Sequence, residues 1–91
     1  MKVISSLEDV KSFIKDNKSD RKISLIPTMG NLHIGHMKLI KSASSSSVKV
    51  VSIYVNELQF NDKNDYSNYP RTLADDLSLC EDNNVDLVFT P

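Results

Sequence analysis

Two histidines around a glycine are the residues of this chain best suited to chemistry. His33 and His36 enclose Gly35 in the segment His-Ile-Gly-His, which follows an apolar run at Ile23–Ile26. The apolar positions that come next predict a helix beginning near Gly35, so both imidazoles are expected in its first turn. Unpaired N–H groups and the positive end of the helix dipole attract anions there. The spacing therefore predicts binding and activation of a nucleoside triphosphate.

Each histidine also has an ordinary explanation, since a lone histidine in a soluble domain is more often a surface or satisfied core residue. The paired spacing between a strand and a helix favours the functional interpretation. Zinc binding is the competing chemistry, but the chain does not offer the ligands for it. Cys80 is distant in sequence on a separate expected helix, and no H-x3-H or C-x2-C spacing occurs.

Two glycines in the same segment favour a tight turn that can carry an anion. Gly35 leaves no Cβ between a bound anion and the backbone. Gly30 permits the unusual φ angle that a strand-to-helix turn needs. Pro27 is expected to end the strand before this turn.

Strand and helix patterns alternate along the chain, which is typical of a parallel sheet with crossover helices. The sequence therefore predicts an α/β fold, a Rossmann-like parallel sheet of βαβαβ order with a preceding N-terminal helix. The expected strands are Ile23–Ile26, Val48–Val55 and Asp86–Thr90. The first expected helix carries Leu7, Val10, Phe13 and Ile14 behind a cap at Ser5 or Ser6. The second runs from Gly35 to about Ala43, and the third carries Leu73, Leu77 and Cys80. A long polar loop is expected at Asn56–Arg71, before the third helix.

Polar segments follow two of the expected strands. Pro27–His36 comes after the first strand, and Asn56–Phe60 comes after the second. Ligands of such sheets bind beyond the carboxyl ends of the strands. Right-handed crossovers allow these two strands to be neighbours. We therefore expect the two segments to converge on one site.

Composition limits the class of protein. The chain has 91 residues, enough for one small domain, and its 11 basic and 12 acidic residues give no electrostatic footprint for nucleic acid. The single cysteine excludes an internal disulfide. The sequence has no apolar run long enough for a signal peptide or a membrane span. From the charge balance we expect no nucleic-acid partner, and from the lack of an apolar run we expect no membrane partner and a cytoplasmic location.

The motifs of the second half sharpen the interpretation of the first. They are Val51-Ser52-Ile53-Tyr54-Val55-Asn56, Gln59-Phe60, Tyr69-Pro70-Arg71-Thr72-Leu73, Asp76-Leu77 and Val85-Asp86-Leu87-Val88-Phe89-Thr90-Pro91. Their order and spacing resemble the pantothenate synthetase family from about Ile23 to the last residue. Class I aminoacyl-tRNA synthetases and other H-x-G-H nucleotidyltransferases share only the first motif. Two positions depart from the family pattern: Glu57 replaces a usual proline, and Ile34 a frequent acidic residue.

The resemblance implies ATP-dependent ligation of pantoate and β-alanine to pantothenate through a pantoyl adenylate. It implies ATP as substrate, Mg²⁺ as cofactor and a homodimer for the full-length protein. Members of the family are considerably longer, so residues 1–91 are expected to form the N-terminal portion of a Rossmann-like nucleotide-binding domain, with an incomplete site. The alternatives are a folded ligand-binding fragment without catalysis and another H-x-G-H nucleotidyltransferase.

The resemblance also implies roles for individual residues. The implied catalytic residues are His33 and His36; the substrate-binding residues are Met29, Asn56 and Gln59; the nucleotide-binding residues are Pro27, Thr28, His33, Gly35 and His36; further candidates are Tyr69, Asp75 and Asp76. Asn56 and Gln59 could instead satisfy loop backbone groups, and Tyr69 could belong to a turn before the next helix. Asp75 and Asp76 are explained by capping of that helix, with a role near magnesium as the alternative. No metal ligand is assigned.

Overall fold

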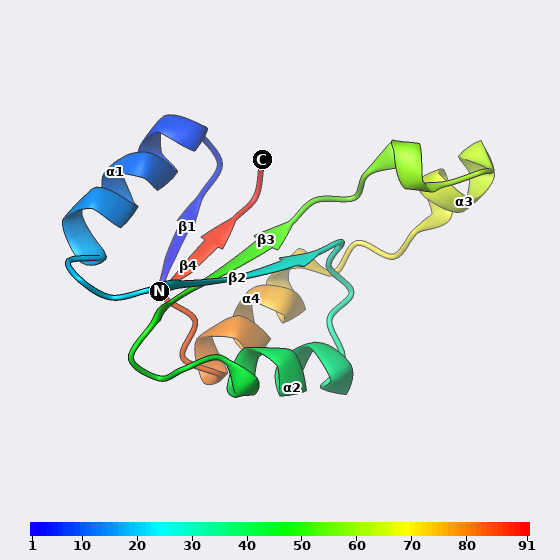
Figure 1. The fold of residues 1–91 in the computed structure, drawn as a ribbon. Helices are drawn as coiled ribbons and strands as arrows, with labels where there is room; N and C mark the ends of the chain where they lie inside the picture. Colours follow the sequence, from blue (N-terminus) through cyan, green and yellow to red (C-terminus); the bar gives the residue numbers. More distant parts are fainter.

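The computed structural model describes all residues from Met1 to Pro91 as an α/β fold (Figure 1). The elements are β1 (Lys2–Ile4), α1 (Leu7–Asn17), β2 (Ile23–Thr28), α2 (Ile34–Ser42), β3 (Val48–Ile53), the 3-10 helix η1 (Glu57–Gln59), α3 (Lys63–Asn68), α4 (Leu73–Asp82) and β4 (Leu87–Phe89). The four strands form one parallel sheet in the order β1-β4-β3-β2. The predicted fold class is confirmed, and β2 and β3 are neighbours as expected.

Helices cover both faces of the sheet, with α1 on one face and α2 and α4 on the other (Figure 1). Successive residues of a strand point to opposite faces, and β3 divides its valines accordingly. Val48 and Val50 pack with α1 residues such as Val10. Val51 packs with Cys80 of α4, and the set on that face is Ile26, Ile40, Val51, Cys80, Val85 and Val88. The central strand is therefore buried on both sides, as parallel strands usually are.

Cys80 belongs to this core, as its helical spacing predicts. Its side chain is fully buried, and burial, followed by the charge of Asp76, raises the pKa of the Cys80 thiol to about 11. The thiol therefore stays protonated and has no nucleophilic character at neutral pH.

The first strand was not predicted from the sequence. β1 precedes α1 and pairs in parallel with β4 at one edge of the sheet, with Val3 opposite Val88. The segment has only three residues, too few to show the alternation by which strands are recognised. The structure therefore adds one strand before the predicted N-terminal helix. That helix is capped by Ser6, whose side chain accepts from the Asp9 N–H.

Pro27 does not end the strand, which corrects the prediction. It lies inside β2 opposite Ser52, and the strand continues to Thr28. The Thr28 carbonyl accepts from Tyr54, so the backbone of Thr28 faces β3. The backbone of Pro27 then faces away from β3, because neighbouring residues alternate. No strand within residues 1–91 pairs with that side, so the missing N–H of proline breaks no hydrogen bond of this sheet.

The predicted long loop at Asn56–Arg71 contains two short helices, which is a second correction. The η1 segment is capped by the Asn56 side chain, and α3 is capped by Asp62. The α3 sequence, Lys-Asn-Asp-Tyr-Ser-Asn, has no apolar periodicity, so its pattern gives no helical signal. In Figure 1 both helices extend away from the sheet beyond β3. β3 itself ends at Ile53, two residues before the predicted end.

None of the helices is both long enough and apolar enough to span a membrane.

Candidate active site

The turn between β2 and α2 has an unusual backbone. Gly30 and Asn31 have consecutive positive φ angles of 76° and 51°. The Thr28 hydroxyl accepts from the Gly30 N–H at 3.1 Å and donates to the Ser52 carbonyl at 2.9 Å. Thr28 thus links the start of the turn to the neighbouring strand. The expected role of Gly30 as a positive-φ residue is confirmed.

His33 and His36 form the N-terminal cap of α2. His33 is the N-cap residue, and its Nδ1 accepts from the Gly35 N–H at 3.0 Å. The Nδ1 of His36 accepts from the His33 N–H at 3.1 Å. This is a reciprocal capping box, in which each side chain satisfies a backbone donor of the first turn. The two ring centroids are 4.2 Å apart. The predicted placement of both imidazoles in one helical turn is confirmed.

Gly35 allows this arrangement for a reason that the sequence does not reveal. A Cβ at this position would lie 2.8 Å from Cε1 and 3.1 Å from Nδ1 of His33. The ring of His33 therefore occupies the space that any other side chain would need. The missing Cβ serves the imidazole directly.

The capping bonds determine which ring nitrogen is free. A neutral imidazole has one donor and one acceptor nitrogen, and in both rings Nδ1 is the acceptor. The proton of each neutral ring is therefore on Nε2. His33 and His36 thus offer two N–H donors at the positive end of a helix dipole.

We expect His36 to titrate below its ordinary pKa of 6.5. Burial of the ring lowers the pKa of His36, the neighbouring His33 lowers it further, and Asp76 opposes the shift. A lowered pKa means that the unfolded chain takes up this proton first, so the free energy of unfolding falls as the pH drops below 6.5 towards the folded-state value. Ring ¹⁵N spectra recorded against pH measure the midpoint. A midpoint above 6.5 would mean that the charge of Asp76 outweighs burial and the neighbouring His33.

A cavity of about 470 Å³ lies beyond the carboxyl ends of β2 and β3. Its lining residues are Pro27, Thr28, Met29, His36, Ser52, Tyr54, Asn56, Gln59 and Tyr69. All of these except Ser52 and Tyr54 are predicted site residues, so the expected convergence of the two polar segments is confirmed. Sequence reasoning missed Ser52 and Tyr54. Both could have been predicted, because they lie at the carboxyl end of the expected strand that precedes Asn56–Phe60, where ligands of parallel sheets bind.

The residues of the second segment differ in how they are held. The Asn56 side-chain oxygen accepts from Leu58, so this end of the amide satisfies the backbone. Gln59 is exposed on η1. The ring of Tyr69 packs edge-on against Phe60 with centroids 5.6 Å apart. Gln59 and Tyr69 therefore present polar groups to the cavity from the region of the short helices that the sequence did not predict.

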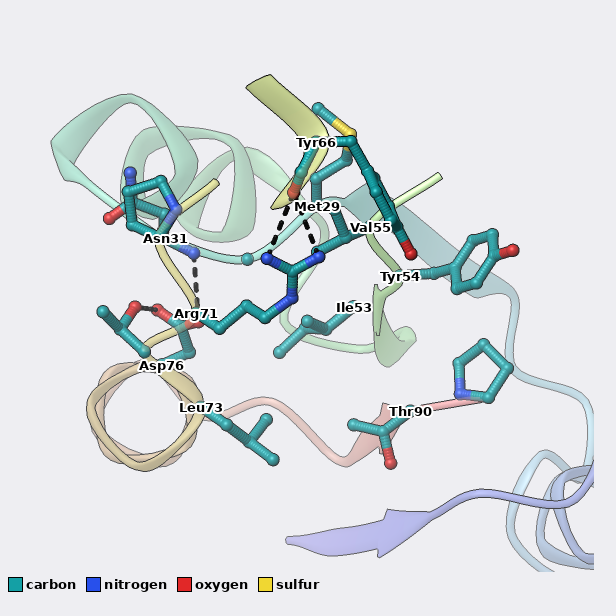
Figure 2. A pocket seen from close by; sticks show the side chains of 14 residues that line it. Met29, Asn31, Ile53, Tyr54, Val55, Tyr66, Arg71, Leu73, Asp76 and Thr90 are labelled. Carbon is teal, nitrogen blue, oxygen red and sulfur yellow. Dashed lines mark hydrogen bonds between the residues drawn. The ribbon is translucent and has the colours of Figure 1, made fainter. Parts of the chain in front are cut away.

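Arg71, which lies just before α4, holds the C-terminal end of α3. Its guanidinium donates to the carbonyls of Tyr66, at 3.3 Å, and Tyr69, at 2.8 Å. It also lies over the Tyr66 ring, 5.2 Å from the centroid. Figure 2 shows the guanidinium beside Tyr66 in an adjoining cavity of about 320 Å³. Arg71 thus stabilises the segment that carries Tyr69, which lines the 470 Å³ cavity.

Four predicted site residues do not line the 470 Å³ cavity: His33, Gly35, Asp75 and Asp76. His33 and Gly35 act through the capping box described above. Asp75 is exposed on α4, whereas Asp76 is 3% exposed. Both carboxylate oxygens of Asp76 accept hydrogen bonds within the protein.

The acidic residues do not fit a magnesium site. No group of three or more histidine, cysteine or acidic side chains comes together anywhere in the chain. Both oxygens of Asp76 are already engaged by protein donors, and Asp75 is exposed on the outside of the helix. Magnesium demands near-octahedral oxygen coordination. These residues alone therefore provide no site for the ion, and no step is assigned to it.

The parallel sheet, the helix that begins at His-x-Gly-His after β2 and the cavity at the carboxyl ends of the strands define an α/β domain of the nucleotidyltransferase type. Residues 2–91 match the family model for pantoate-beta-alanine ligase. The chain belongs to this family.

Curated relatives agree with this assignment. The chain is 46% identical over 91 residues to pantothenate synthetase from Coxiella burnetii (strain RSA 493 / Nine Mile phase I), covering 99% of this chain and 35% of the relative. It is 52% identical over 93 aligned residues to pantothenate synthetase from Clostridium botulinum (strain Loch Maree / Type A3), covering 100% of this chain and 33% of the relative. The chain thus spans about a third of the length of these relatives.

Solved structures give the same result. Pantoate-beta-alanine ligase from Francisella tularensis, complexed with beta-gamma ATP and beta-alanine, superposes with a TM-score of 0.92 at 40% identity. The match covers 100% of this chain and 35% of that one. The enzyme from Thermus thermophilus superposes with a TM-score of 0.86 at 36% identity, covering 100% of this chain and 32% of that one. The fold is that of the nucleotidyltransferase-type part of these enzymes.

Proposed function

We propose that these residues carry the nucleotide-activating half of an ATP-dependent ligase that joins pantoate to β-alanine. The observation that carries the proposal is the pair of imidazoles at the start of α2. Both have Nδ1 engaged by backbone donors and Nε2 left as a free donor. His36 borders the cavity that Met29, Asn56 and Gln59 also line. A donor suited to a phosphate and amide groups suited to a hydroxy acid thus lie at the same cavity.

In the first step, a carboxylate oxygen of pantoate attacks the α-phosphorus of ATP. A new P–O bond forms, the bond to the bridging oxygen breaks, and pyrophosphate leaves with the electron pair. Negative charge therefore grows on the leaving oxygen. Two Nε2–H donors at the positive end of a helix dipole stabilise such charge, and they are already oriented before the reaction begins.

In the second step, the amine of β-alanine attacks the acyl carbonyl of the pantoyl adenylate. A C–N bond forms, AMP leaves with the carboxyl–phosphate oxygen, and the amine loses a proton. No covalent bond to the protein is needed. Positioning of the two reactants and exclusion of water from the adenylate supply the rate enhancement.

Three further assignments belong to this proposal and rest on the family resemblance. Magnesium enters bound to the phosphates of ATP, because this ion is commonly bound through substrate phosphates. The whole protein acts as a homodimer. It works in the cytoplasm without a nucleic acid or membrane partner.

Two assays on the whole protein that carries these residues test the proposal. Pantothenate formation from ATP, pantoate and β-alanine measures the complete reaction. Exchange of labelled pyrophosphate into ATP measures the first step alone, and it is expected to require pantoate. Exchange that proceeds without pantoate would indicate a different nucleotidyltransferase. ATP binding without exchange would indicate a ligand-binding protein with no catalysis.

Gln59→Leu is expected to raise the Michaelis constant for pantoate by about tenfold or more and to leave that for ATP nearly unchanged. An apolar side chain of similar size leaves the polar groups of the substrate unpaired, which costs roughly 1–3 kcal/mol. Steady-state kinetics with each substrate varied in turn provide the measurement.

Leu58→Ala is the matched control for this substitution. Leu58 is the preceding residue of η1, is 92% exposed and does not line the cavity. It should leave both Michaelis constants unchanged. If Gln59→Leu altered only the constant for ATP, the side chain would belong to the nucleotide subsite.

A further inference from the structure

Asp76 of α4 is a buried carboxylate that binds a distant backbone segment. It is 3% exposed, and its oxygens accept from the N–H groups of Asn31 at 3.0 Å and Leu32 at 2.9 Å. A third bond comes from the Thr72 hydroxyl at 3.1 Å. The backbone partners are 44 and 45 residues away in sequence. A buried charge is costly unless it is fully hydrogen-bonded, so this contact is specific.

The turn that Asp76 binds is built to receive an anion. Gly30 and Asn31 both have positive φ angles, and the successive N–H groups of Asn31 and Leu32 each donate to one oxygen of the carboxylate. Gly30 also lets the carboxylate come close, since a Cβ there would lie 3.0 Å from Oδ2 of Asp76. Figure 2 shows Asp76 on α4 with Asn31 directly above it. The carboxylate thus stabilises a backbone conformation that Asn31 adopts at an energetic cost.

The end of this turn is the start of the catalytic helix. Leu32, whose N–H donates to Asp76, directly precedes the N-cap residue His33. The direction of the His33 N–H in turn decides whether it reaches Nδ1 of His36. The position of both imidazoles therefore depends on the backbone that Asp76 holds.

We propose that Asp76 is a positioning residue for adenylate formation, acting on His33 and His36 through the Gly30–Leu32 turn without touching substrate. This inference rests on the proposed function of the histidine pair. Asp76 does not line the 470 Å³ cavity, although it borders the adjoining cavity of about 320 Å³. Its two bonds to backbone N–H groups are the contacts that connect it to the start of α2. Asn31, whose φ is positive, and Leu32 carry its influence on the reaction.

The test is Asp76→Asn in the whole protein, with Asp82→Asn as the matched control. An asparagine retains one acceptor but turns its NH₂ group towards a backbone donor, so at least one bond to the turn is lost. Pantoate-dependent pyrophosphate exchange is expected to fall at least about tenfold, with the Michaelis constant for pantoate changed less than about twofold. Asp82→Asn is the same chemical change at an exposed position on the same helix, and it should leave exchange unchanged.

A double-mutant cycle separates positioning from general stability. In a His36→Ala background, Asp76→Asn should lower exchange by a clearly smaller factor than in the parent protein, because one of the two rings through which it acts is gone. Two effects that multiply independently would overturn the proposal. A variant that only weakens the fold would give such independent effects.

Two further measurements keep the test decisive. Ring ¹⁵N shifts of His36 report the Nδ1-accepting tautomer without any turnover, and Asp76→Asn should move them whether or not the protein is a ligase. Unmoved shifts together with reduced exchange would reject positioning, whereas absent exchange in the parent would reject the proposed function alone.

Should Asp76→Asn not fold, Thr72→Val removes only the hydroxyl bond. It should lower exchange about two- to threefold, and unchanged exchange would overturn the proposal.

Discussion

Replacing His36 by alanine in the whole protein is expected to lower pantoate-dependent pyrophosphate exchange by about 10²–10³-fold, the scale of one lost preorganised donor. The ring supplies an Nε2–H at the border of the cavity and is not part of the apolar core. The fold should therefore persist, with a loss of stability near the ~0.5–2 kcal/mol that a helix cap contributes. Exchange assays and thermal unfolding together provide the measurement.

Ile34→Ala is the control for this variant. Ile34 lies between the two histidines, is 69% exposed and makes no capping bond through its side chain. Its substitution should change exchange by less than about twofold. Equal exchange in His36→Ala and the parent protein would remove His36 from the chemistry and leave it as a helix cap.

The part of the site that follows from the sequence is the part that local patterns encode. The run at Ile23–Ile26, the glycines and the His-x-Gly-His spacing each report on a neighbouring stretch of chain, and the structure places them in one strand, turn and helix. The convergence of the two segments after β2 and β3 follows from a general property of parallel sheets, so it was also predictable.

Other features depend on contacts that no local pattern records. The partners of Asp76 are two backbone N–H groups 44 and 45 residues earlier, so its sequence context suggests only helix capping. Pro27 is acceptable inside β2 because its backbone faces away from β3, and this depends on the pairing of the strands. The short α3 has no apolar stripe and is stabilised by the Asp62 cap and by Arg71.

The imidazoles also serve two purposes that are usually separate. A helix N-cap normally uses the oxygen of a hydroxyl, carboxylate or amide side chain to accept a backbone N–H. An imidazole caps through Nδ1 and still carries a proton on Nε2 at the far side of the ring. Each histidine can therefore fix the first turn of α2 and donate to an anion from the same ring.

This coupling of cap and donor leads to the second large effect, which is expected for Gly35→Ala. The new Cβ would lie 2.8 Å from Cε1 of His33, so the ring must leave its position. Exchange should fall at least about tenfold and approach the loss expected for His33→Ala. Stability should change little, because alanine gains ~1 kcal/mol over glycine inside a helix while the displaced cap loses a similar amount.

The combination of Gly35→Ala with His33→Ala identifies the cause of the loss. In the double variant the ring that would meet the new Cβ is absent, so Gly35→Ala should reduce exchange by less than about twofold beyond His33→Ala alone. A further loss of about tenfold would mean that the methyl group obstructs the bound nucleotide itself. In that case the glycine would serve the approach of the phosphates to the backbone, as the sequence alone suggests, and the contact with the His33 ring would be secondary.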